Sequence, residues 1–364
     1  MNRLDRLIKE LCPNGVEYSH LESVCNISKG VQFNKSNMQD KGTYPVINGG
    51  INLSGYIDQF NQNENTITIS QGGASAGYVN WLTVKFWAGA HCYILKPSEC
   101  ILNRYLFHFL KSREYKLQEC QYGAGIPALA KSTLAELFIP IPPLPVQCEI
   151  VRILDNFTEL TAELAAELTA RKKQYEYYRN KLLTFGDEVE WKTLSDVLKI
   201  KNGKDYKQFG EGNIPVYGSG GIMTYIDTFV LDKPSVLIPR KGSIDKLYYV
   251  DVPFWTVDTI FYTEIYTNVV IPKFVFYYLQ KEHLEQYNTA GGVPSLTQTV
   301  LNRIAFPVPP LSEQERIVSI LDKFDALVND ISIGLPAEIQ ARQKQYEYYR
   351  DMLLSFKEAA NEQL

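Results

Sequence analysis

The chain has 364 residues, 45% of them apolar, with a formal net charge of −4 and a sequence pI of about 5.7. This length and apolar content predict two or three domains, each with its own core, and exclude a disordered or fibrous protein. The acidic balance excludes binding to nucleic acid through overall positive charge. Because the N-terminus is charged and no apolar stretch is long enough for a membrane span, we expect a soluble, cytoplasmic protein that does not associate with a membrane.

The cysteines also bear on the compartment. All six lie in the first half of the chain, at Cys12, Cys25, Cys92, Cys100, Cys120 and Cys148. A disulfide framework would not be confined to one half of a chain with several domains. We therefore expect reduced thiols, as in cytosolic proteins.

The predicted elements alternate between globular segments and helices. Residues 1–17 predict a short amphipathic helix, and residues 18–140 predict a globular domain in which short β-branched and aromatic runs are separated by Gly, Asn and Asp turns. Residues 188–308 have the same character. Each globular segment also contains one helical stretch, at 103–118 and at 272–287. We expect two mixed, β-rich domains.

A long helix follows each globular segment. Apolar residues occupy most heptad positions within 141–187, which predicts a coiled-coil helix of about 40 residues. A second coiled-coil helix is predicted within 309–357, where four extra residues around Gly334 are expected to break or kink it. The last residues, 358–364, are expected to form a disordered tail.

The two halves of the chain repeat each other. The segment RKKQYEYYRNKLLTF at 171–185 returns as RQKQYEYYRDMLLSF at 342–356 with four changes in fifteen positions. The segments GAGIPALAKSTL and PPLPVQCEIVRILDNF return in the same order as AGGVPSLTQTVL and PPLSEQERIVSILDKF. A period of about 170 residues indicates a duplicated domain rather than a solenoid. The expected fold class is α+β, with an approximate two-fold internal repeat.

No catalytic or metal-binding constellation stands out in the sequence. The four histidines have no ligand spacing with one another or with cysteine pairs, and His91 with Cys92, inside a strand-like run, is expected to belong to the core. There is no G-x-x-x-x-G-K-[ST] loop, and none of the glycine pairs fits G-x-G-x-x-G, so turns explain them. We therefore expect no catalytic residues, no metal site, no cofactor and no enzyme activity of the chain's own.

The paired PPLPVQCEIVRILDNF and PPLSEQERIVSILDKF segments, the QYEYYR helices and the opening RLIKELCPNGVEY resemble the conserved regions of DNA specificity subunits of type I restriction-modification systems. The resemblance covers the whole chain. It implies two target recognition domains, each recognising one half of a bipartite site in double-stranded DNA, separated by two long antiparallel coiled-coil helices. It also implies docking of two modification (methyltransferase) subunits and, in the full complex, of restriction (motor and nuclease) subunits. S-adenosylmethionine, ATP and Mg²⁺ would bind to those partners.

The candidate DNA contacts are local clusters of basic and amide side chains, because Arg and Lys bind phosphates or guanine, and Asn and Gln bind adenine. In the first domain they are Lys29, Gln32, Asn34, Lys35, Ser70 and Gln71. In the second domain they are Lys199, Lys201, Asn202, Lys204, Lys207, Arg240, Lys241 and Lys246. For any one of these residues the alternative is an ordinary solvated side chain.

Two identical partner subunits require two equivalent docking surfaces, and the duplicated QYEYYR segment supplies them. Tyr175 and Tyr178 are expected to fill the seam between the helices, with their charged and aromatic neighbours facing outward. The predicted docking residues are Lys173, Glu176, Tyr177 and Arg179 in the first copy, and Lys344, Glu347, Tyr348 and Arg350 in the second. A solvated helix face is the alternative.

Two other functions are compatible with the sequence. One is a DNA-modifying enzyme in its own right, which turnover of DNA by the purified chain with Mg²⁺ or S-adenosylmethionine would reveal. The other is a coiled-coil interaction protein that does not bind DNA. Retention on DNA only in the presence of a modification subunit would contradict the second.

Overall fold

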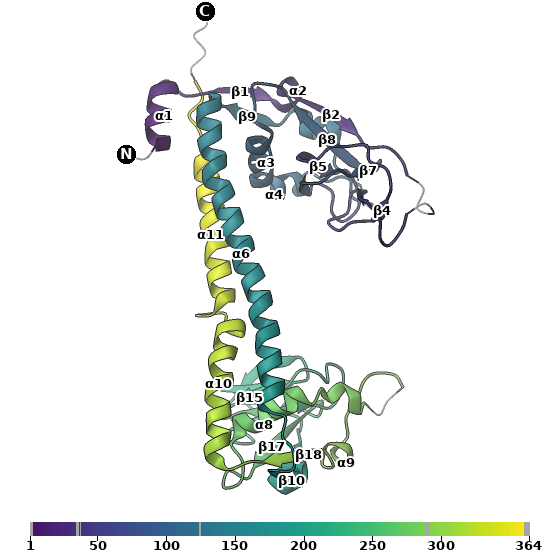
Figure 1. Cartoon of the computed structure of the whole chain (residues 1–364), viewed down its shortest axis with the longest axis vertical. Helices are drawn as coiled ribbons and strands as arrows, with labels where there is room; N and C mark the ends of the chain where they lie inside the picture. Colours follow the sequence, from purple (N-terminus) through teal and green to yellow (C-terminus); the bar gives the residue numbers. More distant parts are fainter. Residues whose placement is uncertain (1–2, 34–35, 37, 124, 289–290, 360–364) are drawn as a thin grey trace, which may run out of the picture. The chain divides into compact units, whose positions relative to one another are not determined.

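The computed structural model describes residues 3–33, 36, 38–123, 125–288 and 291–359 (Figure 1). The chain divides into two compact units. Unit 1 comprises Met1–Leu164 and Ile339–Leu364, and unit 2 comprises Ala165–Glu338. The division falls inside two long helices, α6 (Leu144–Leu182) and α11 (Leu335–Leu353), so each unit is a globular part with segments of these helices.

Unit 1 contains three small sheets. A four-stranded antiparallel sheet has the order β2-β8-β5-β6, a three-stranded sheet has the order β4-β3-β7 with β3 and β7 parallel, and β1 pairs with β9. Their bounds are β1 Glu17–His20, β2 Cys25–Lys29, β3 Tyr44–Ile47, β4 Gly55–Ile57, β5 Thr66–Ser70, β6 Val79–Leu82, β7 Trp87–Ala88, β8 Cys92–Pro97 and β9 Phe138–Ile141.

Unit 2 repeats these sheets strand for strand. The orders are β11-β17-β14-β15, β13-β12-β16 with β12 and β16 parallel, and β10-β18. The bounds are β10 Glu190–Thr193, β11 Leu198–Asn202, β12 Glu211–Gly218, β13 Gly221–Ile226, β14 Ser235–Pro239, β15 Tyr248–Val250, β16 Trp255–Thr256, β17 Ile260–Ile265 and β18 Ala305–Val308. The predicted duplication and the α+β class are confirmed, and the duplication extends to the sheet topology.

The predicted helices lie where the sequence places them, and the short helices α2, α5, α7 and α9 were not predicted. Those of unit 1 are α1 Arg3–Leu11, α2 Leu21–Val24, α3 Asn103–Ser112, α4 Glu114–Glu119 and α5 Lys131–Ala135. Those of unit 2 are α7 Leu194–Val197, α8 Pro272–Lys281, the 3₁₀ helix η2 Leu284–Tyr287, α9 Gln298–Leu301 and α10 Leu311–Asn329. The N-terminal helix and the helical stretches at 103–118 and 272–287 are confirmed, although each stretch divides into two helices.

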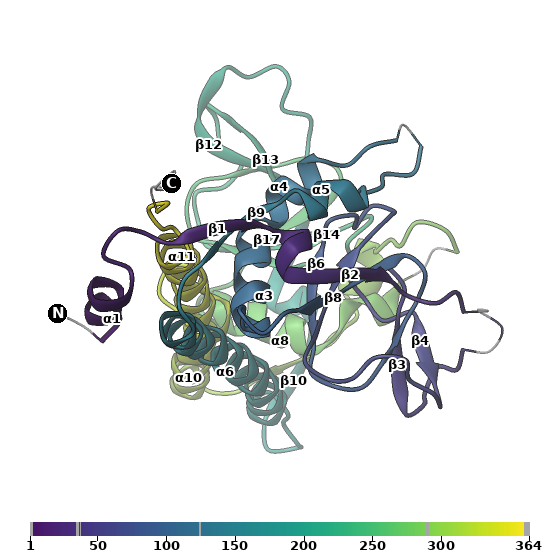
Figure 2. The same cartoon turned by 90° about the horizontal axis from the view of Figure 1, so that it is seen from above.

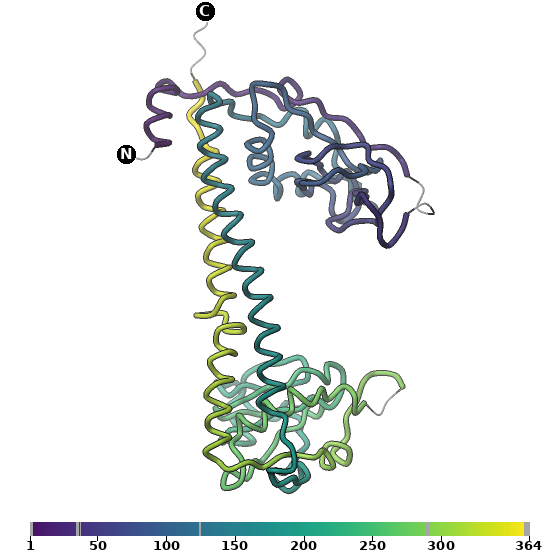
Figure 3. The backbone as a smooth tube through the Cα atoms, viewed as in Figure 1, coloured from purple at the N-terminus to yellow at the C-terminus, as the bar shows by residue number. Residues whose placement is uncertain are grey.

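The predicted break in the second long helix is confirmed, and α6 is uninterrupted (Figure 3). Between α10 and α11, the Asp330 carboxylate accepts hydrogen bonds from the backbone N–H groups of Ser332 (2.7 Å) and Ile333 (3.2 Å). A Cβ at Gly334 would lie 2.5 Å from the Ala326 carbonyl oxygen, so only glycine allows this close approach.

The long helices pair within each unit. In unit 1 the first part of α6 and the last part of α11 run side by side in opposite directions (Figures 1 and 2), and the Phe157 and Tyr349 rings stack at 5.4 Å. In unit 2 the last part of α6 lies against α10, where Tyr178 stacks on Phe324 at 5.6 Å. Aromatic residues at heptad positions therefore form the seams, as the sequence predicts.

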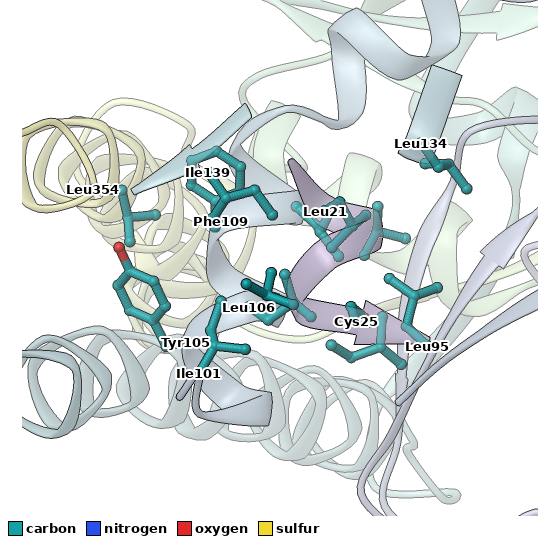
Figure 4. Packing of buried hydrophobic residues seen from close by; sticks show 14 of the residues in the cluster. Leu21, Cys25, Leu95, Ile101, Tyr105, Leu106, Phe109, Leu134, Ile139 and Leu354 are labelled. Atoms are coloured by element: carbon teal, nitrogen blue, oxygen red, sulfur yellow. The ribbon is translucent and has the colours of Figure 1, made fainter. Parts of the chain in front are cut away.

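The core of unit 1 contains residues from its four-stranded sheet and from segments near both ends of the described chain. Helix α3 lies between the four-stranded sheet and α6 (Figures 1 and 2) and buries Tyr105, Leu106 and Phe109. Leu354, just after α11, lies beside Tyr105 in this core (Figure 4). The predicted disordered tail 358–364 is wrong for Glu358 and Ala359, which are hydrogen-bonded in unit 1, and residues 360–364 lie outside the described residues. Val16 pairs with Glu358, and the Ala359 N–H donates to the Val16 carbonyl at 2.9 Å.

A buried glutamine attaches the start of α6 to unit 1. The Gln147 side chain is fully buried; its Oε1 accepts from the Leu102 N–H at 2.8 Å, and its Nε2 donates to the carbonyls of Cys100 (2.9 Å) and Pro142 (2.8 Å). These bonds satisfy the amide completely within the core. In the sequence, Gln147 is only one of the polar residues within the predicted coiled-coil helix.

Gln314 makes the same three bonds at the start of α10. Its Oε1 accepts from the Ile271 N–H at 2.8 Å, and its Nε2 donates to the carbonyls of Val269 (3.2 Å) and Pro309 (2.8 Å). It is also fully buried. The two glutamines thus connect each long helix to the loop before α3 or α8.

We expect Gln147→Leu to lower the free energy of unfolding by about 3 kcal/mol, because it leaves a buried N–H and two buried carbonyls without partners. Gln314→Leu should cost a similar amount, and the two losses should add because the sites lie in different units. Chemical denaturation measures the two single variants and the double variant. Gln343→Leu, at an exposed position of α11, is the control and should change stability little.

A second duplicated cluster joins the globular helix to the long helices. In unit 1 the Asp155 carboxylate of α6 accepts from Arg104 Nε (2.7 Å) and contacts His108 Nε2 (2.8 Å), while His108 Nδ1 lies 3.1 Å from the Tyr346 hydroxyl. In unit 2 Asp322 accepts from Lys273 (2.8 Å) and from the Tyr277 hydroxyl (2.6 Å). Histidine in unit 1 therefore takes the place of tyrosine in unit 2.

His108 makes the stability of unit 1 depend on pH. Burial lowers its pKa from the ordinary value of 6.5, and although Asp155 opposes this effect, the pKa remains lowered in the presence of Arg104 and Arg350. The unfolded chain therefore binds the proton more readily, so unit 1 should lose stability as the pH falls below 6.5. Tyr277 has a raised pKa and stays neutral in this range.

Hydrogen exchange, corrected for the intrinsic pH dependence of the amides, should therefore show α3 opening more readily at pH 5.5 than at pH 7, with no matching change in α8. His108→Gln should remove the difference between the two helices. An equal response of α3 and α8 in the unmodified chain would contradict this assignment.

Candidate nucleic-acid interface

In each unit three loops meet at one end of the strands. We call residues 48–54, 71–77 and 125–129 the unit 1 tip. In unit 1, His91 joins two of these loops, because its N–H donates to Asn48 Oδ1 (3.4 Å) and its carbonyl accepts from the Gln71 N–H (2.8 Å). The third loop is joined by the Gly73 N–H, which donates to the Pro127 carbonyl at 2.8 Å.

The unit 2 tip, residues 218–223, 240–246 and 291–296, has the same main-chain bonds to its second and third loops, while the bond to its first loop runs in the opposite direction. Thr259 takes the place of His91, accepting from the Ser219 N–H at its hydroxyl (3.3 Å) and from the Arg240 N–H at its carbonyl (2.8 Å). The Gly242 N–H donates to the Pro294 carbonyl at 3.0 Å. The two tips therefore share one backbone arrangement.

This arrangement makes Gln71 and Arg240 equivalent residues. Each directly follows a central strand, β5 or β14. The Gln71 carbonyl accepts from the Leu129 N–H at 2.7 Å, and the Arg240 carbonyl accepts from the Leu296 N–H at 2.9 Å. The same backbone position thus carries an amide in unit 1 and a guanidinium in unit 2, the two groups best suited to adenine and guanine respectively.

A second pair of equivalent residues lies on the neighbouring strands. Lys29 ends β2 opposite Tyr93, and Asn202 ends β11 opposite Phe261. With its amide oriented to satisfy both groups, Gln71 accepts from Lys29 Nζ at 2.9 Å and donates to the Ala90 carbonyl at 3.3 Å. The tip of unit 1 therefore presents a lysine and a glutamine in contact with each other.

The corresponding contacts in unit 2 differ. Asn202 Oδ1 accepts from Gln298 Nε2 at 3.2 Å, and the Arg240 guanidinium lies 5.8 Å from the centre of the Phe261 ring. Gln298, at the start of α9, is a polar residue that the sequence analysis missed. The sequence repeat could have revealed it, because aligning GIPALAK with GVPSLTQ gives Gln298 the same position as Lys131 in the first repeat.

Most predicted DNA contacts are accessible. Exposed positions are Lys29, Gln32, Lys199, Asn202, Lys204, Lys207, Lys241 and Lys246, and half-buried ones are Gln71, Lys201 and Arg240. Asn34 and Lys35 lie outside the described residues. The predicted contacts gather in part: Lys29 with Gln71, and Asn202, Arg240 and Lys241 with the segment around Ser295.

Three of the predictions need revision. Ser70 is a correction: it is only 5% exposed, because β5 is central in its sheet and buries both faces. Lys201 lies on β11 with its Nζ 3.6 Å from Glu264, an exposed ion pair that contributes little stability but offsets its charge locally. His91 is also a correction. Cys92 is buried as expected, whereas the His91 side chain is exposed.

The QYEYYR segment of α6 has an inner and an outer side. Tyr175 is 6% exposed and burial raises its pKa to about 12, whereas Tyr177 is 60% exposed, with Lys173 and Glu176 beside it in solvent. Arg179 is a correction: it is half-buried, with its guanidinium 5.5 Å from the centre of the Tyr175 ring. An arginine four residues after a seam tyrosine lies on the same helix face.

The second copy has the same arrangement. Tyr348 is 66% exposed and Lys344 and Glu347 are also in solvent. Arg350 is the corresponding correction, since its side chain is 14% exposed and lies 5.6 Å from the centre of the Tyr346 ring. Three of the four predicted docking residues in each copy therefore face outward.

Other sites were sought among the described residues. No group of three or more His, Cys, Asp or Glu side chains there could hold a metal ion. In that part of the chain, no helix combines the length and the apolar character needed to cross a membrane.

The comparisons with known proteins agree with the duplicated architecture. The family described as "Type I restriction modification DNA specificity domain" matches residues 13–171 and again residues 186–341, one match for each repeat. The chain belongs to this family. It is a specificity subunit, and such subunits recognise DNA for a restriction-modification system without catalysing a reaction.

Two relatives illustrate the match. The chain is 32% identical over 374 residues to a Haemophilus influenzae protein provisionally named a type I restriction enzyme specificity subunit, covering 94% of this chain and 96% of that protein. It is 40% identical over 262 residues to the EcoR124I/EcoR124II specificity subunit of Escherichia coli, covering 62% of this chain and 65% of that one.

A solved structure has the same fold. The S subunit of a type I restriction-modification system from M. genitalium matches with a TM-score of 0.66 at 23% identity, covering 93% of this chain and 96% of that one. A chain from a solved type I system, in a study of complex assembly and conformational transition, matches with a TM-score of 0.58 at 16% identity, over 94% of this chain and 98% of that chain.

We expect Lys241→Ala to weaken DNA binding by the assembled complex several-fold and to reduce the slope of log K against log[salt] by about one, because one phosphate contact is lost. Lys233→Ala is the matched control. Both lysines are exposed, but Lys233 precedes β14 and Lys241 follows it, so they lie at opposite ends of one strand. Titrations at several salt concentrations measure the effect. Equal losses in the two variants would place the DNA elsewhere.

Proposed function

We propose that this specificity subunit recognises a bipartite site in double-stranded DNA, with one half-site for each unit, and that it docks two methyltransferase subunits. The observation that supports the first part most is the equivalence of the two tips. Identical backbone hydrogen bonds hold Gln71 in one tip and Arg240 in the other. Two tips with the same frame and different side chains suit a target with two different halves.

The partners supply what this chain lacks. The net charge is −4, and the basic residues near the tips are few, with Lys29 next to the unit 1 tip and Arg240, Lys241 and Lys246 in the unit 2 tip, so the chain's own attraction for DNA is expected to be weak. S-adenosylmethionine is assigned to the methyltransferase subunits, and ATP and Mg²⁺ to restriction subunits in the full complex. We place this complex in the cytoplasm, where DNA and both cofactors are present.

DNA titrations of the chain alone and with two methyltransferase subunits test this function. The chain alone should bind DNA weakly. The complex should bind tightly and should prefer DNA that contains the motif it methylates. The same affinity with and without the partners would contradict the scaffold part of the proposal. Failure of the complex to bind DNA at all would favour an interaction protein that does not contact DNA.

Tyr177 and Tyr348 are proposed as the centres of the two docking surfaces. Exposed aromatic residues often dominate the binding energy of an interface, and each of these tyrosines lies edge-on against a seam tyrosine, at 5.3 Å and 5.4 Å between ring centres. Each lies between exposed charges of both signs, which suits a polar rim around an aromatic centre.

We expect Tyr177→Ala or Tyr348→Ala to weaken binding of one methyltransferase subunit by about 30-fold, the effect of losing about 2 kcal/mol at a binding hot spot. Each single variant should form complexes that contain one methyltransferase subunit, and the double variant should form complexes with none. Mass photometry distinguishes the stoichiometries. Tyr115→Ala, at a 72% exposed position on α4, is the control and should retain both subunits.

A further inference from the structure

Each tip exposes an aliphatic side chain at the same position. Ile126 in unit 1 is 78% exposed, and Val293 in unit 2 is 70% exposed. Both directly precede a proline, Pro127 or Pro294, whose carbonyl accepts the glycine N–H that joins the tip. A residue before proline is restricted to extended backbone, so the direction of each aliphatic side chain is limited.

Described residues on both sides of these side chains are hydrogen-bonded. In unit 1 the N–H and carbonyl groups of Tyr122 and Ala128 form two reciprocal hydrogen bonds of 2.9 Å. In unit 2 the Ser295 N–H donates to Asn288 Oδ1 at 2.9 Å. Exposure of an apolar side chain next to hydrogen-bonded backbone fits a surface that meets a partner.

The aliphatic residues lie on the segments that pair with the polar residues already described, three residues before the paired position. Leu129, three residues after Ile126, donates its N–H to the Gln71 carbonyl, and Leu296, three residues after Val293, donates its N–H to the Arg240 carbonyl. The bridges Gly72–Ala128 and Lys241–Ser295 continue the same pairing. Strands paired in this way are about 5 Å apart, so the polar and apolar side chains can reach one nucleic-acid groove together.

The polar residue of the tip changes its chemical group between the units, whereas the aliphatic residue does not. Between the units the polar residue changes from an amide to a guanidinium, while its neighbour stays a β-branched aliphatic residue. The C5-methyl group of thymine is the apolar group on the base edges in the major groove of DNA, and aliphatic side chains contact it. A β-branched side chain also loses little rotamer freedom on making such a contact.

We propose that Ile126 and Val293 are specificity-determining residues that contact thymine methyl groups, one in each half-site, beside the bases that face Gln71 and Arg240. This inference rests on the proposed function, since it requires that the tips bind duplex DNA. Each tip then combines one polar contact and one apolar contact, both fixed by the same backbone hydrogen bonds.

The test replaces thymine by deoxyuridine, which lacks only the C5-methyl group. The duplex carries the motif methylated by the full complex, and each thymine of the motif is replaced in turn. With the unmodified complex, replacement at one thymine in each half-site should weaken binding about fourfold, equivalent to the ~0.8 kcal/mol of one buried methyl group.

The variants assign each sensitive thymine to a residue. Ile126→Ala should abolish the deoxyuridine effect in one half-site and leave the other unchanged, and Val293→Ala should do the reverse. Val84→Ala, at a 51% exposed position of unit 1, is the control and should leave both effects intact. Both substituted tip residues are exposed, so the variants are expected to fold normally.

Four outcomes would overturn the inference. Sequence-specific binding without any deoxyuridine-sensitive thymine would overturn it while leaving the proposed function intact. A deoxyuridine effect that persists in both alanine variants would assign the methyl contacts to other residues. Loss of DNA bending in Ile126→Ala with an unchanged deoxyuridine effect would assign Ile126 to insertion between base pairs. Absence of specific binding by the unmodified complex would overturn the proposed function as well.

Discussion

The structure of each unit depends on a buried amide at the start of a long helix. The first turn of α6 or α10 has backbone groups without intrahelical partners, and the polar loop before α3 or α8 must also be satisfied on burial. Gln147 and Gln314 satisfy such loop groups from the helix side, at distances of 2.8 to 3.2 Å. The direction in which each helix leaves its globular part follows from these bonds. About two helical turns further on, Asp155 or Asp322 then lies within hydrogen-bond distance of side chains on α3 or α8. We call these contacts the aspartate clusters.

The long helices and the duplication could be predicted from sequence because their signals are local and repeated. The globular parts could not be, since their sheets pair strands that are far apart in the chain. Val46 pairs with Trp87, and Lys29 with Tyr93. Ser70 shows the same limit, because the alternation of buried and exposed residues fails in a strand that is buried on both faces. Arg179 and Arg350 were predictable, however, because a spacing of four residues from a seam tyrosine places an arginine on the seam face.

The two units keep backbone contacts and change side chains. The joining hydrogen bonds at the tips recur with similar lengths, while Gln71 becomes Arg240, Lys29 becomes Asn202 and His91 becomes Thr259. The same holds in the aspartate cluster, where His108 corresponds to Tyr277. The main-chain bonds of Gln71 and Arg240 do not depend on the side chains that differ, so this part of the frame tolerates such exchanges. Recognition chemistry can therefore diverge between the units at little cost in folding.

The pairing of Val16 with Glu358 also bears on whether the elements could follow one another in a different order along the chain. Because Val16 is hydrogen-bonded to the segment that contains Glu358 and Ala359, the chain between them begins and ends at one place in unit 1. The native contacts along this closed path do not require the chain to begin at one particular residue. A circular permutant that begins in the turn between α10 and α11, with the original ends joined by a short linker, would keep every sheet and both buried glutamines. Its termini would lie between α10 and α11 instead of beside the N-terminal helix, and the same elements would follow one another in a different order along the chain.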